Sequence, residues 1–282
     1  MRIGMNLLLW TTHVGPEHFQ LLHTLAAKGF NGVEIPIFGG TETEFKAVGS
    51  ELKRAGLGCS TITTCTPGAS PVSPDAAERA RAVERLKWVL DMSAIVGADL
   101  LSGPYVCPLG QFTGVAPTDE EKKRAADVLR AGAEHAATLK LRIAVEFLCR
   151  FETYMLNTVA DACELARRVD HPSVGILYDT FHANIEEKDP PAALAAAGDY
   201  VIHFHVSEND RGTPGSGHVQ WSETFKTLRK MKYEGWLTIE SFSRVLPELA
   251  AATRVWRDLS PSAEDVYDGG VRFIKRMWDQ AG

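Results

Sequence analysis

An abrupt change from apolar to polar residues marks the stretch Val174-Gly-Ile-Leu-Tyr-Asp-Thr-Phe-His-Ala-Asn-Ile-Glu-Glu187. Its first half is typical of a strand buried in a parallel sheet. Its second half begins at Asp179 and includes His182. Because α/β proteins place ligand sites at the carboxyl ends of buried strands, we expect this acid and this histidine to lie beside a site.

Three other apolar runs also carry a ligand-type side chain near their ends, namely Glu146, His205 and Glu240. Burying an unpaired carboxylate is costly, so acids that directly follow apolar runs favour ligands over loop-edge charges. His203 and His205 share one face of their strand, and His205 lies nearer the end. We therefore expect His205 to be a ligand and His203 to be a hydrogen-bonded core residue one layer below.

Strand and helix patterns alternate from one end of the chain to the other. The expected strands occupy residues 2–10, 32–38, 58–65, 100–106, 142–148, 174–179, 200–206 and 237–242. The expected helices begin at Pro16, occupy residues 42–55, about 75–96, 118–140 and 158–169, follow Pro190, and occupy residues 222–231 and 263–279. These eight units, with no composition break, predict an α/β fold, a single (β/α)8 TIM barrel domain over residues 1–282, rather than a doubly wound sheet.

A barrel brings the carboxyl ends of all its strands to one mouth. Residues that are far apart in the sequence would then meet, and we expect Glu146, Asp179, His205 and Glu240 to converge there. Three carboxylates and one imidazole form a mixed oxygen and nitrogen set suited to a divalent metal ion.

The composition excludes several classes of protein. The 282 residues are 45% hydrophobic and 23% charged, as in soluble globular enzymes. A net charge of −6 without a Lys or Arg block argues against nucleic-acid binding. No stretch approaches the ~18 apolar residues of a membrane span, so no membrane partner is expected. The five cysteines form no CxxC pair, which favours a reducing cytoplasm.

Other polar residues have less specific patterns. Arg211 lies in a Gly/Pro-rich loop that matches no phosphate-binding motif, and we interpret it as a flexible loop that presents one arginine to an oxyanion or hydroxyl. Glu152 is either a helix-capping or solvated acid or part of the site, and His182 is either a helix-start residue or a substrate donor. Cys65 and Cys107 lie near strand ends, but no base is paired with either, so nucleophilic catalysis is not expected.

Four stretches together resemble the D-tagatose 3-epimerase family, the ketose 3-epimerases among the xylose-isomerase-like barrels. They are Glu146-Phe-Leu-Cys-Arg-Phe-Glu152, Asp179-Thr-Phe-His-Ala-Asn-Ile-Glu-Glu187, His203-Phe-His-Val-Ser-Glu-Asn-Asp-Arg211 and Ile239-Glu-Ser-Phe242. The resemblance implies that Glu146, Asp179, His205 and Glu240 bind one divalent metal ion, typically Mn²⁺, with Mg²⁺ or Co²⁺ as substitutes. It also implies that Glu152, His182 and Arg211 hold the O1–O3 end of the substrate, and that the protein is a homodimer or homotetramer.

The implied activity is reversible epimerisation of free ketoses at C3, as in D-tagatose/D-sorbose, D-fructose/D-psicose or L-ribulose/L-xylulose. It would proceed through a cis-enediolate with Glu146 and Glu240 as acid/bases, and without an organic cofactor. Leu109 stands where some family members carry an aromatic residue, which leaves the preferred sugar open.

Three other functions are alternatives to ketose 3-epimerisation. An aldose–ketose isomerase on the same barrel would move a proton between C1 and C2. An apurinic-site endonuclease would need more metal ligands and a basic face for DNA. A sugar-binding barrel without catalytic activity would not need both Glu146 and Glu240.

Overall fold

Eight parallel strands close into a barrel in the computed structural model, which describes residues 1–282. The strands are β1 (Arg2–Asn6), β2 (Gly32–Pro36), β3 (Gly58–Ile62), β4 (Leu100–Gly103), β5 (Arg142–Glu146), β6 (Val174–Asp179), β7 (Val201–Val206) and β8 (Trp236–Ile239). Each strand pairs with the next in sequence, and β8 pairs with β1. The predicted (β/α)8 barrel is confirmed.

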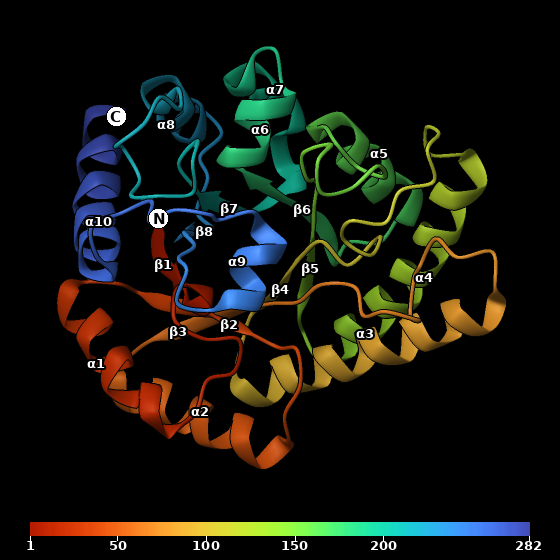
Figure 1. Ribbon diagram of the computed structural model, residues 1–282, viewed down its shortest axis with the longest axis horizontal. Helices are drawn as coiled ribbons and strands as arrows, with labels where there is room; N and C mark the ends of the chain where they lie inside the picture. Colours follow the sequence, from red (N-terminus) through yellow and green to blue (C-terminus); the bar gives the residue numbers. More distant parts are fainter.

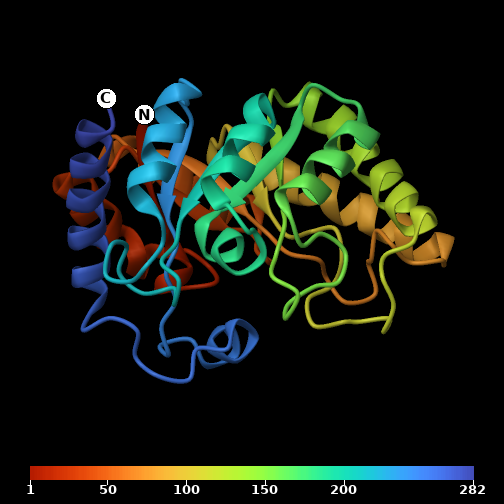
Figure 2. The same ribbon diagram turned by 90° about the horizontal axis from the view of Figure 1, so that it is seen from above.

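Helices surround the barrel, and the two chain ends lie close to one another (Figures 1 and 2). The helices are α1 (Phe19–Lys28), α2 (Glu42–Ala55), α3 (Ala76–Val96), α4 (Asp119–Thr138), α5 (Val159–Val169), α6 (Thr180–Glu186), α7 (Pro190–Ala197), α8 (Trp221–Lys230), α9 (Pro247–Thr253) and α10 (Ala263–Gln280). None of them is both long enough and apolar enough to cross a membrane.

The helix starts that the sequence indicates are present. Asp75 accepts a hydrogen bond from the Ala77 amide at the start of α3, and Thr118 and Glu121 form a reciprocal capping box at the start of α4. Such caps satisfy backbone donors that have no partner inside the first turn of a helix.

Six of the eight expected strands were too long at their carboxyl ends, while the expected ends at Asp179 and Val206 are correct. The first was expected to reach Trp10 but ends at Asn6, whose side chain accepts the Leu8 amide and starts a 3₁₀ turn at Leu7–Leu9. Two short helices, α6 and α9, were not expected. The first follows β6 directly, and the second lies in the long segment between β8 and α10, in front of the barrel in Figure 1.

The side chains of each strand alternate between two buried regions, the layer between the sheet and the helices and the inside of the barrel. Side chains that point outward pack under the helices, as where the rings of Tyr178 and Phe204 stack 5.2 Å apart. On the inward face, Leu100, Ala144 and Leu177 form a small apolar cluster of their own. Because strand residues two apart share a face, the next inward layer toward the mouth on these strands is polar: Ser102, Glu146 and Asp179.

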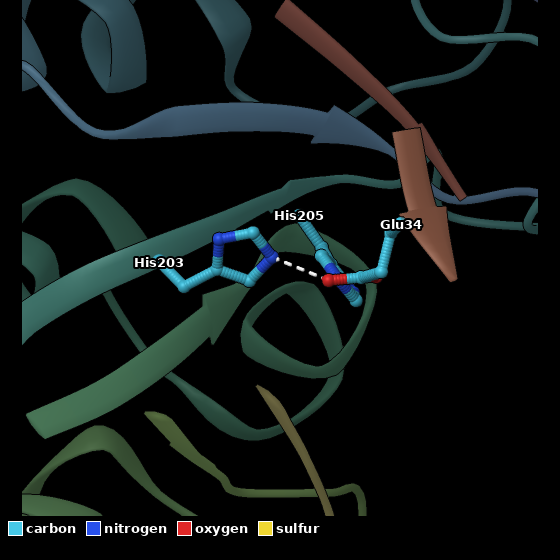
Figure 3. Close-up of side chains that lie close together, drawn as sticks. All are labelled: Glu34, His203 and His205. Atoms are coloured by element: carbon cyan, nitrogen blue, oxygen red, sulfur yellow. Dashed lines mark hydrogen bonds and ion pairs between the residues drawn. The ribbon is translucent and has the colours of Figure 1, made fainter. Parts of the chain in front are cut away.

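The polar layer extends across the barrel. Glu34 points inward from β2 and meets His203 and His205 of β7, a strand that is not its neighbour in the barrel (Figure 3). All three side chains are fully buried. Directly beneath the mouth, the barrel interior is therefore a hydrogen-bonded polar layer, whereas apolar side chains dominate the interior of most such barrels.

Candidate active site

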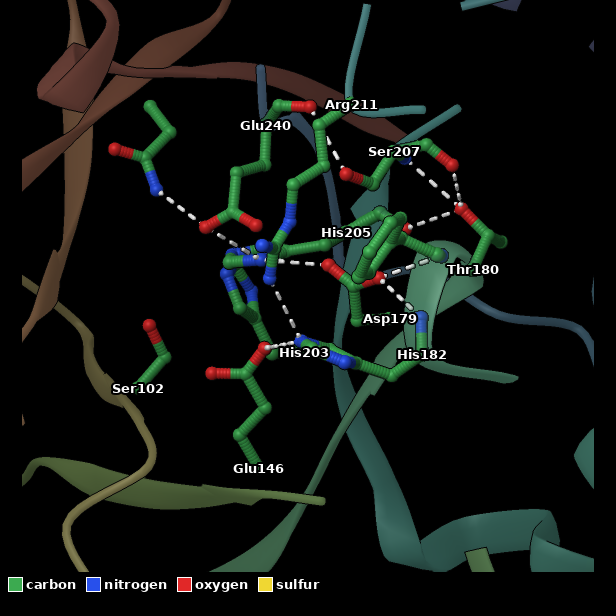
Figure 4. A network of polar contacts seen from close by, with 12 residues as sticks. Ser102, Glu146, Asp179, Thr180, His182, His203, His205, Ser207, Arg211 and Glu240 are labelled. Atoms are coloured by element: carbon green, nitrogen blue, oxygen red, sulfur yellow. Dashed lines mark hydrogen bonds and ion pairs between the residues drawn. The ribbon is translucent and has the colours of Figure 1, made fainter. Parts of the chain in front are cut away.

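Four side chains from four neighbouring strands meet at the mouth (Figure 4). Glu146 ends β5, Asp179 ends β6, His205 lies in β7, and Glu240 directly follows β8. One oxygen or nitrogen atom of each lies within 4.8 Å of the others, and all four residues are buried. The convergence that the sequence predicted is what the barrel produces.

The two oxygens of the Asp179 carboxylate have different surroundings. Its Oδ1 accepts hydrogen bonds from the amides of Phe181 (2.6 Å) and His182 (3.2 Å), and so caps α6. Its Oδ2 is buried and has no hydrogen-bond partner. The short helix fixes the carboxylate so that this second oxygen faces the cluster.

The contact between Nε2 and Glu34 orients the His205 ring. Nε2 lies 2.8 Å from Glu34 Oε2, which leaves Nδ1 on the site side, 3.4 Å from Asp179 Oδ2 and 3.3 Å from Glu240 Oε1. Nδ1 is buried without a properly formed hydrogen bond. Buried polar atoms are rarely left unpaired. Two such atoms facing one another, within a set of carboxylates and an imidazole, fit a divalent cation bound among them.

Electrostatics favour the same interpretation. Burial raises the pKa of Glu146 well above its usual value, and the Glu240 carboxylate raises it further. Burial also raises the pKa of Glu240. Two buried carboxylates beside a third are costly to keep ionised without a compensating charge, and a cation among them would supply it.

Metal affinity is expected to fall as the pH is lowered. Burial opposes a charge on His205, but the Glu34 and Glu240 carboxylates outweigh burial and raise the pKa of its imidazole well above the usual value. A cation held by Nδ1 would need its lone pair and would displace that proton, so binding should strengthen with rising pH and release protons. Titration calorimetry of metal-free protein with Mn²⁺, at several pH values and in two buffers of different ionisation enthalpy, measures both effects. Equal affinity at every pH with no proton release would contradict this prediction.

A second group of side chains adjoins the cluster. Arg211 Nη1 lies 2.8 Å from Glu152 Oε1, and its Nη2 lies 3.3 Å from His182 Nε2. The guanidinium also stacks on Phe181, 4.0 Å from the ring centre, and faces Phe242 at 5.1 Å. These contacts bring together Glu152, His182 and Arg211, the three residues with less specific sequence patterns.

Arg211 was expected to be presented by a flexible loop, whereas the structure fixes it by several contacts. Its side chain is buried, its backbone has a positive φ of 64°, and its carbonyl accepts hydrogen bonds from the Phe242 amide and the Ser241 hydroxyl. The segment after β8 thus fixes the arginine. Its Nε is buried and has no partner in the protein.

The structure places both Glu152 and His182 beside the cluster. Glu152 neither caps a helix nor faces solvent, since it is buried against Arg211 and the cap of α5 is Thr158. His182 is both a helix-start residue, in the first turn of α6, and a neighbour of the site, with Nε2 3.8 Å from Glu146 Oε1.

His182 is a hydrogen-bond donor toward the site. Burial lowers the pKa of its imidazole to about 4, so the ring is neutral near pH 7. The Cys149 amide donates to Nδ1 at 2.9 Å, which assigns the ring proton to Nε2. That proton faces Arg211 Nη2, which is also a donor, at 3.3 Å and Glu146 Oε1 at 3.8 Å, so it forms no hydrogen bond within the protein.

A pocket of about 70 Å³ opens above these groups. Its charged and imidazole side chains are those of Glu146, Glu152, His182, Arg211 and Glu240. Its apolar wall includes Leu8, Phe38, Ile62, Leu109, Leu148, Phe242 and Leu249, the last from α9. The arrangement suits a small polyhydroxylated molecule with one strongly polar end.

The cysteines near the mouth do not form part of this pocket. Cys107 lines a smaller adjoining cavity, and Cys65 lines neither. Burial raises the pKa of Cys107 to about 11 and that of Cys65 well above its usual value. Both thiols are thus protonated near pH 7, in keeping with the expectation that neither is a nucleophile.

Glu34 lies in the layer below the cluster, in contact with His205, and was not among the residues predicted from the sequence. Burial would raise the pKa of its carboxyl, but His205 and His203 outweigh burial and hold the pKa below its usual value. The available signal was a single acid inside the apolar run Gly32-Val-Glu-Ile-Pro36. The expectation for His203 is confirmed in that its Nε2 lies 2.8 Å from Glu34 Oε1 in the layer below, although its Nδ1 has no partner.

Comparison with known proteins agrees with this geometry. Residues 22–277 match the family described as xylose isomerase-like TIM barrel. The chain is 33% identical over 278 residues to a protein of Synechocystis sp. named "Probable ketose 3-epimerase", covering 99% of this chain and 97% of that one. It is 32% identical to the L-ribulose 3-epimerase of Methylomonas sp. strain DH-1, covering 79% and 77%. A crystal structure of D-allulose 3-epimerase from Methylomonas sp. in complex with D-allulose superimposes with a TM-score of 0.91, at 26% identity, covering 98% and 97%.

Proposed function

The chain belongs to the xylose isomerase-like TIM barrel family, and within it to the ketose 3-epimerases, and from this premise we propose that it interconverts free ketoses that differ in configuration at C3. It is an isomerase that acts on carbohydrates. The observation that carries the proposal is the convergence of Glu146 and Glu240 with Asp179 and His205 at the mouth of the barrel. The substrate class follows from relatives named for ribulose, psicose and allulose.

One divalent cation is proposed to be held by Glu146, Asp179, His205 and Glu240, with Mn²⁺ as the expected ion and Mg²⁺ or Co²⁺ as substitutes. The support is the donor set itself and the two unpaired atoms, Asp179 Oδ2 and His205 Nδ1. The ion would supply Lewis-acid chemistry, polarising the C2 carbonyl and stabilising the negative charge that develops on O2 and O3.

Proton transfer is assigned to the two glutamates. The C2 carbonyl acidifies the C3 proton, and inversion of C3 requires that a proton leave one face and return to the other. Glu146 extends from β5 and Glu240 from the end of β8, so the two carboxylates approach the pocket from different sides of the barrel. One removes the C3 proton to give the cis-enediolate, the other delivers a proton to the opposite face, and the roles exchange in the reverse reaction.

Substrate holding is assigned to Arg211, His182 and Glu152. The buried Nε of Arg211 has no protein partner, and the Nε2 proton of His182 is directed toward the site, so both can donate to oxygens at the O1–O3 end. Glu152 holds the guanidinium at 2.8 Å and offers its remaining acceptor capacity to a hydroxyl. The apolar wall that includes Leu109 would cover the carbon face of the sugar. A homodimer or homotetramer remains the expected assembly.

Arg211→Ala is expected to raise KM and to lower kcat/KM by about 10- to 100-fold. Hydrogen bonds from a charged donor contribute about 1.5–3 kcal/mol, and each 1.4 kcal/mol is about tenfold. Metal content should not change. Steady-state kinetics on several ketoses gives the result, with Arg211→Lys as a variant that keeps the charge beside Glu152.

The control for this prediction is Arg244→Ala. Arg244 also lies in a loop at the mouth, but it is exposed and pairs with Asp258. Its replacement should leave the kinetics near those of the original protein. If Arg211→Ala behaved like Arg244→Ala on every ketose, the loop after β7 would have only a structural role.

Product identification separates the proposal from its nearest rival. Metal-loaded protein is incubated with a panel of ketohexoses and ketopentoses, and the products are resolved by chromatography that distinguishes 3-epimers from aldoses. The proposal predicts a 3-epimer from at least one ketose and no aldose. Aldose products would support an aldose–ketose isomerase instead.

A further inference from the structure

Glu34 is a buried carboxylate that does not line the pocket, and both of its oxygens have polar partners inside the barrel. Its Oε1 accepts hydrogen bonds from the hydroxyls of Ser60 (3.0 Å) and Ser102 (2.8 Å) and lies 2.8 Å from His203 Nε2. These partners come from β3, β4 and β7. This oxygen is bound entirely within the barrel interior.

The other oxygen of Glu34 faces the site. Oε2 accepts a hydrogen bond from Asn6 Nδ2 at 2.9 Å and lies 2.8 Å from His205 Nε2. The same Asn6 nitrogen also donates to Glu240 Oε1 at 3.1 Å. One oxygen of a residue outside the pocket is thus joined to two of the four converging side chains, directly to His205 and through Asn6 to Glu240.

The other two members of the cluster have no link to Glu34. Asp179 is fixed by two amides of α6. No hydrogen bond holds the Glu146 carboxylate, whose Oε1 lies 3.8 Å from His182 Nε2. The network is therefore one-sided, since it supports His205 and Glu240 and leaves Glu146 unsupported. This difference between the two glutamates is not visible in their positions at the strand ends.

We propose that Glu34 is a positioning residue for both the metal ion and one of the two acid/bases. An acceptor on His205 Nε2 turns the ring so that the Nδ1 lone pair is offered to the cation, and such acceptors strengthen metal binding. Asn6 transmits the same constraint to Glu240 and fixes which carboxylate oxygen remains free. The inference rests on the proposed function, in which His205 and Glu240 hold the cation and Glu240 exchanges a proton with C3.

Glu34→Gln provides the first test, with Ser60→Ala and Ser102→Ala as matched controls. The glutamine has the same size but cannot accept from all five donors, whereas each serine variant removes one hydrogen bond from the oxygen that faces away from the site. We expect Glu34→Gln to weaken Mn²⁺ binding to metal-free protein by about 10- to 100-fold, as measured by calorimetry. Each serine variant should weaken it less. The visible absorption of bound Co²⁺ should change in Glu34→Gln and not in the controls.

Asn6→Asp provides a second test that survives if Glu34→Gln fails to fold. The Asn6 Oδ1 caps the turn at Leu7–Leu9 by accepting the Leu8 amide, and aspartate preserves that acceptor. It replaces the donor toward Glu34 and Glu240 with an oxygen that repels both. We expect kcat to fall more than KM rises, and the exchange of solvent deuterium into C3 to be lost mainly for the epimer whose C3–H faces Glu240.

Opposite results would overturn the proposal. These are original Mn²⁺ affinity and an unchanged Co²⁺ spectrum in folded Glu34→Gln, serine variants as damaging as Glu34→Gln, or equal loss of exchange for both epimers in Asn6→Asp. The metal measurements use no sugar, so they separate this inference from the proposed function. If the original protein epimerised no ketose while Glu34→Gln lost metal, the function would fail and the metal-positioning role would stand. If it epimerised ketoses while Glu34→Gln kept its metal affinity, only the inference would fail.

Discussion

Replacing Glu146 or Glu240 with glutamine is expected to stop epimerisation, lowering kcat by about 10²–10⁴-fold, the range that general acid–base catalysis contributes. Inversion at C3 needs one group to accept a proton and another to donate one from the opposite face, so neither glutamate can replace the other. Glu248→Gln is the matched control, because Glu248 is an exposed glutamate of α9 near the same mouth. It should retain full activity.

Each glutamine variant should still perform half of the reaction. The surviving glutamate can remove and return the C3 proton of the epimer whose C3–H faces it, so in D₂O that epimer alone should exchange its C3 proton without inverting. The two variants should show opposite preferences. Because both residues are also proposed ligands, metal content must be measured first in each. Exchange of the same epimer in both variants would contradict the assignment of one glutamate to each face.

Removal of the metal ion is expected to abolish activity, and Mn²⁺ or Co²⁺ should restore it. A ligand that binds only the folded protein stabilises it by about 2.7 kcal/mol at 100 times its Kd, so metal should also raise the melting temperature. Thermal unfolding and activity are both measured before and after chelation. Full activity in rigorously metal-free protein would contradict the proposed site.

Asp179→Asn is expected to remove the metal ion without disturbing helix α6. An asparagine oxygen can still accept the amides of Phe181 and His182 and cap α6, while a neutral amide nitrogen replaces the unpaired Oδ2. The helix should therefore remain and the metal should be lost. Unchanged metal content and activity in this variant would remove Asp179 from the site.

The fold and the converging residues were predictable from the sequence because both depend on local patterns. Apolar runs that end in a charged residue locate Glu146, Asp179 and Glu240, and alternation of strands and helices closes the barrel that brings them together. Once the barrel is assumed, strand order alone decides that these ends share one mouth.

Glu34 and Asn6 were not predictable because their roles depend on what lies across the barrel. Glu34 is 169 residues from His203 and 171 from His205, on strands that do not pair. A lone acid in an apolar strand indicates a buried partner without indicating which one. The same limit applies to Arg211, whose loop composition suggested flexibility, while Glu152 and Phe181, from other segments, hold its side chain in the interior.

The short helices and the strand ends were missed for a local reason. Helices α6 and α9 are each seven residues long, too short to show a helical repeat of apolar residues. The strands end where side chains begin to satisfy the backbone, as Asn6 does at the end of β1, and apolar residues such as Leu7–Leu9 continue past that point. Hydrophobicity alone does not distinguish the two.

The position of solvent deuterium after turnover in D₂O tests most directly whether the chemistry occurs at C3. The metal-loaded protein is incubated with a ketose that it converts, and the label in the product is located by NMR. Transfer by Glu146 and Glu240 predicts one deuterium at C3 of a 3-epimeric ketose. Deuterium at C1 or C2, with an aldose as the product, would contradict 3-epimerisation and establish an aldose–ketose isomerase on the same barrel.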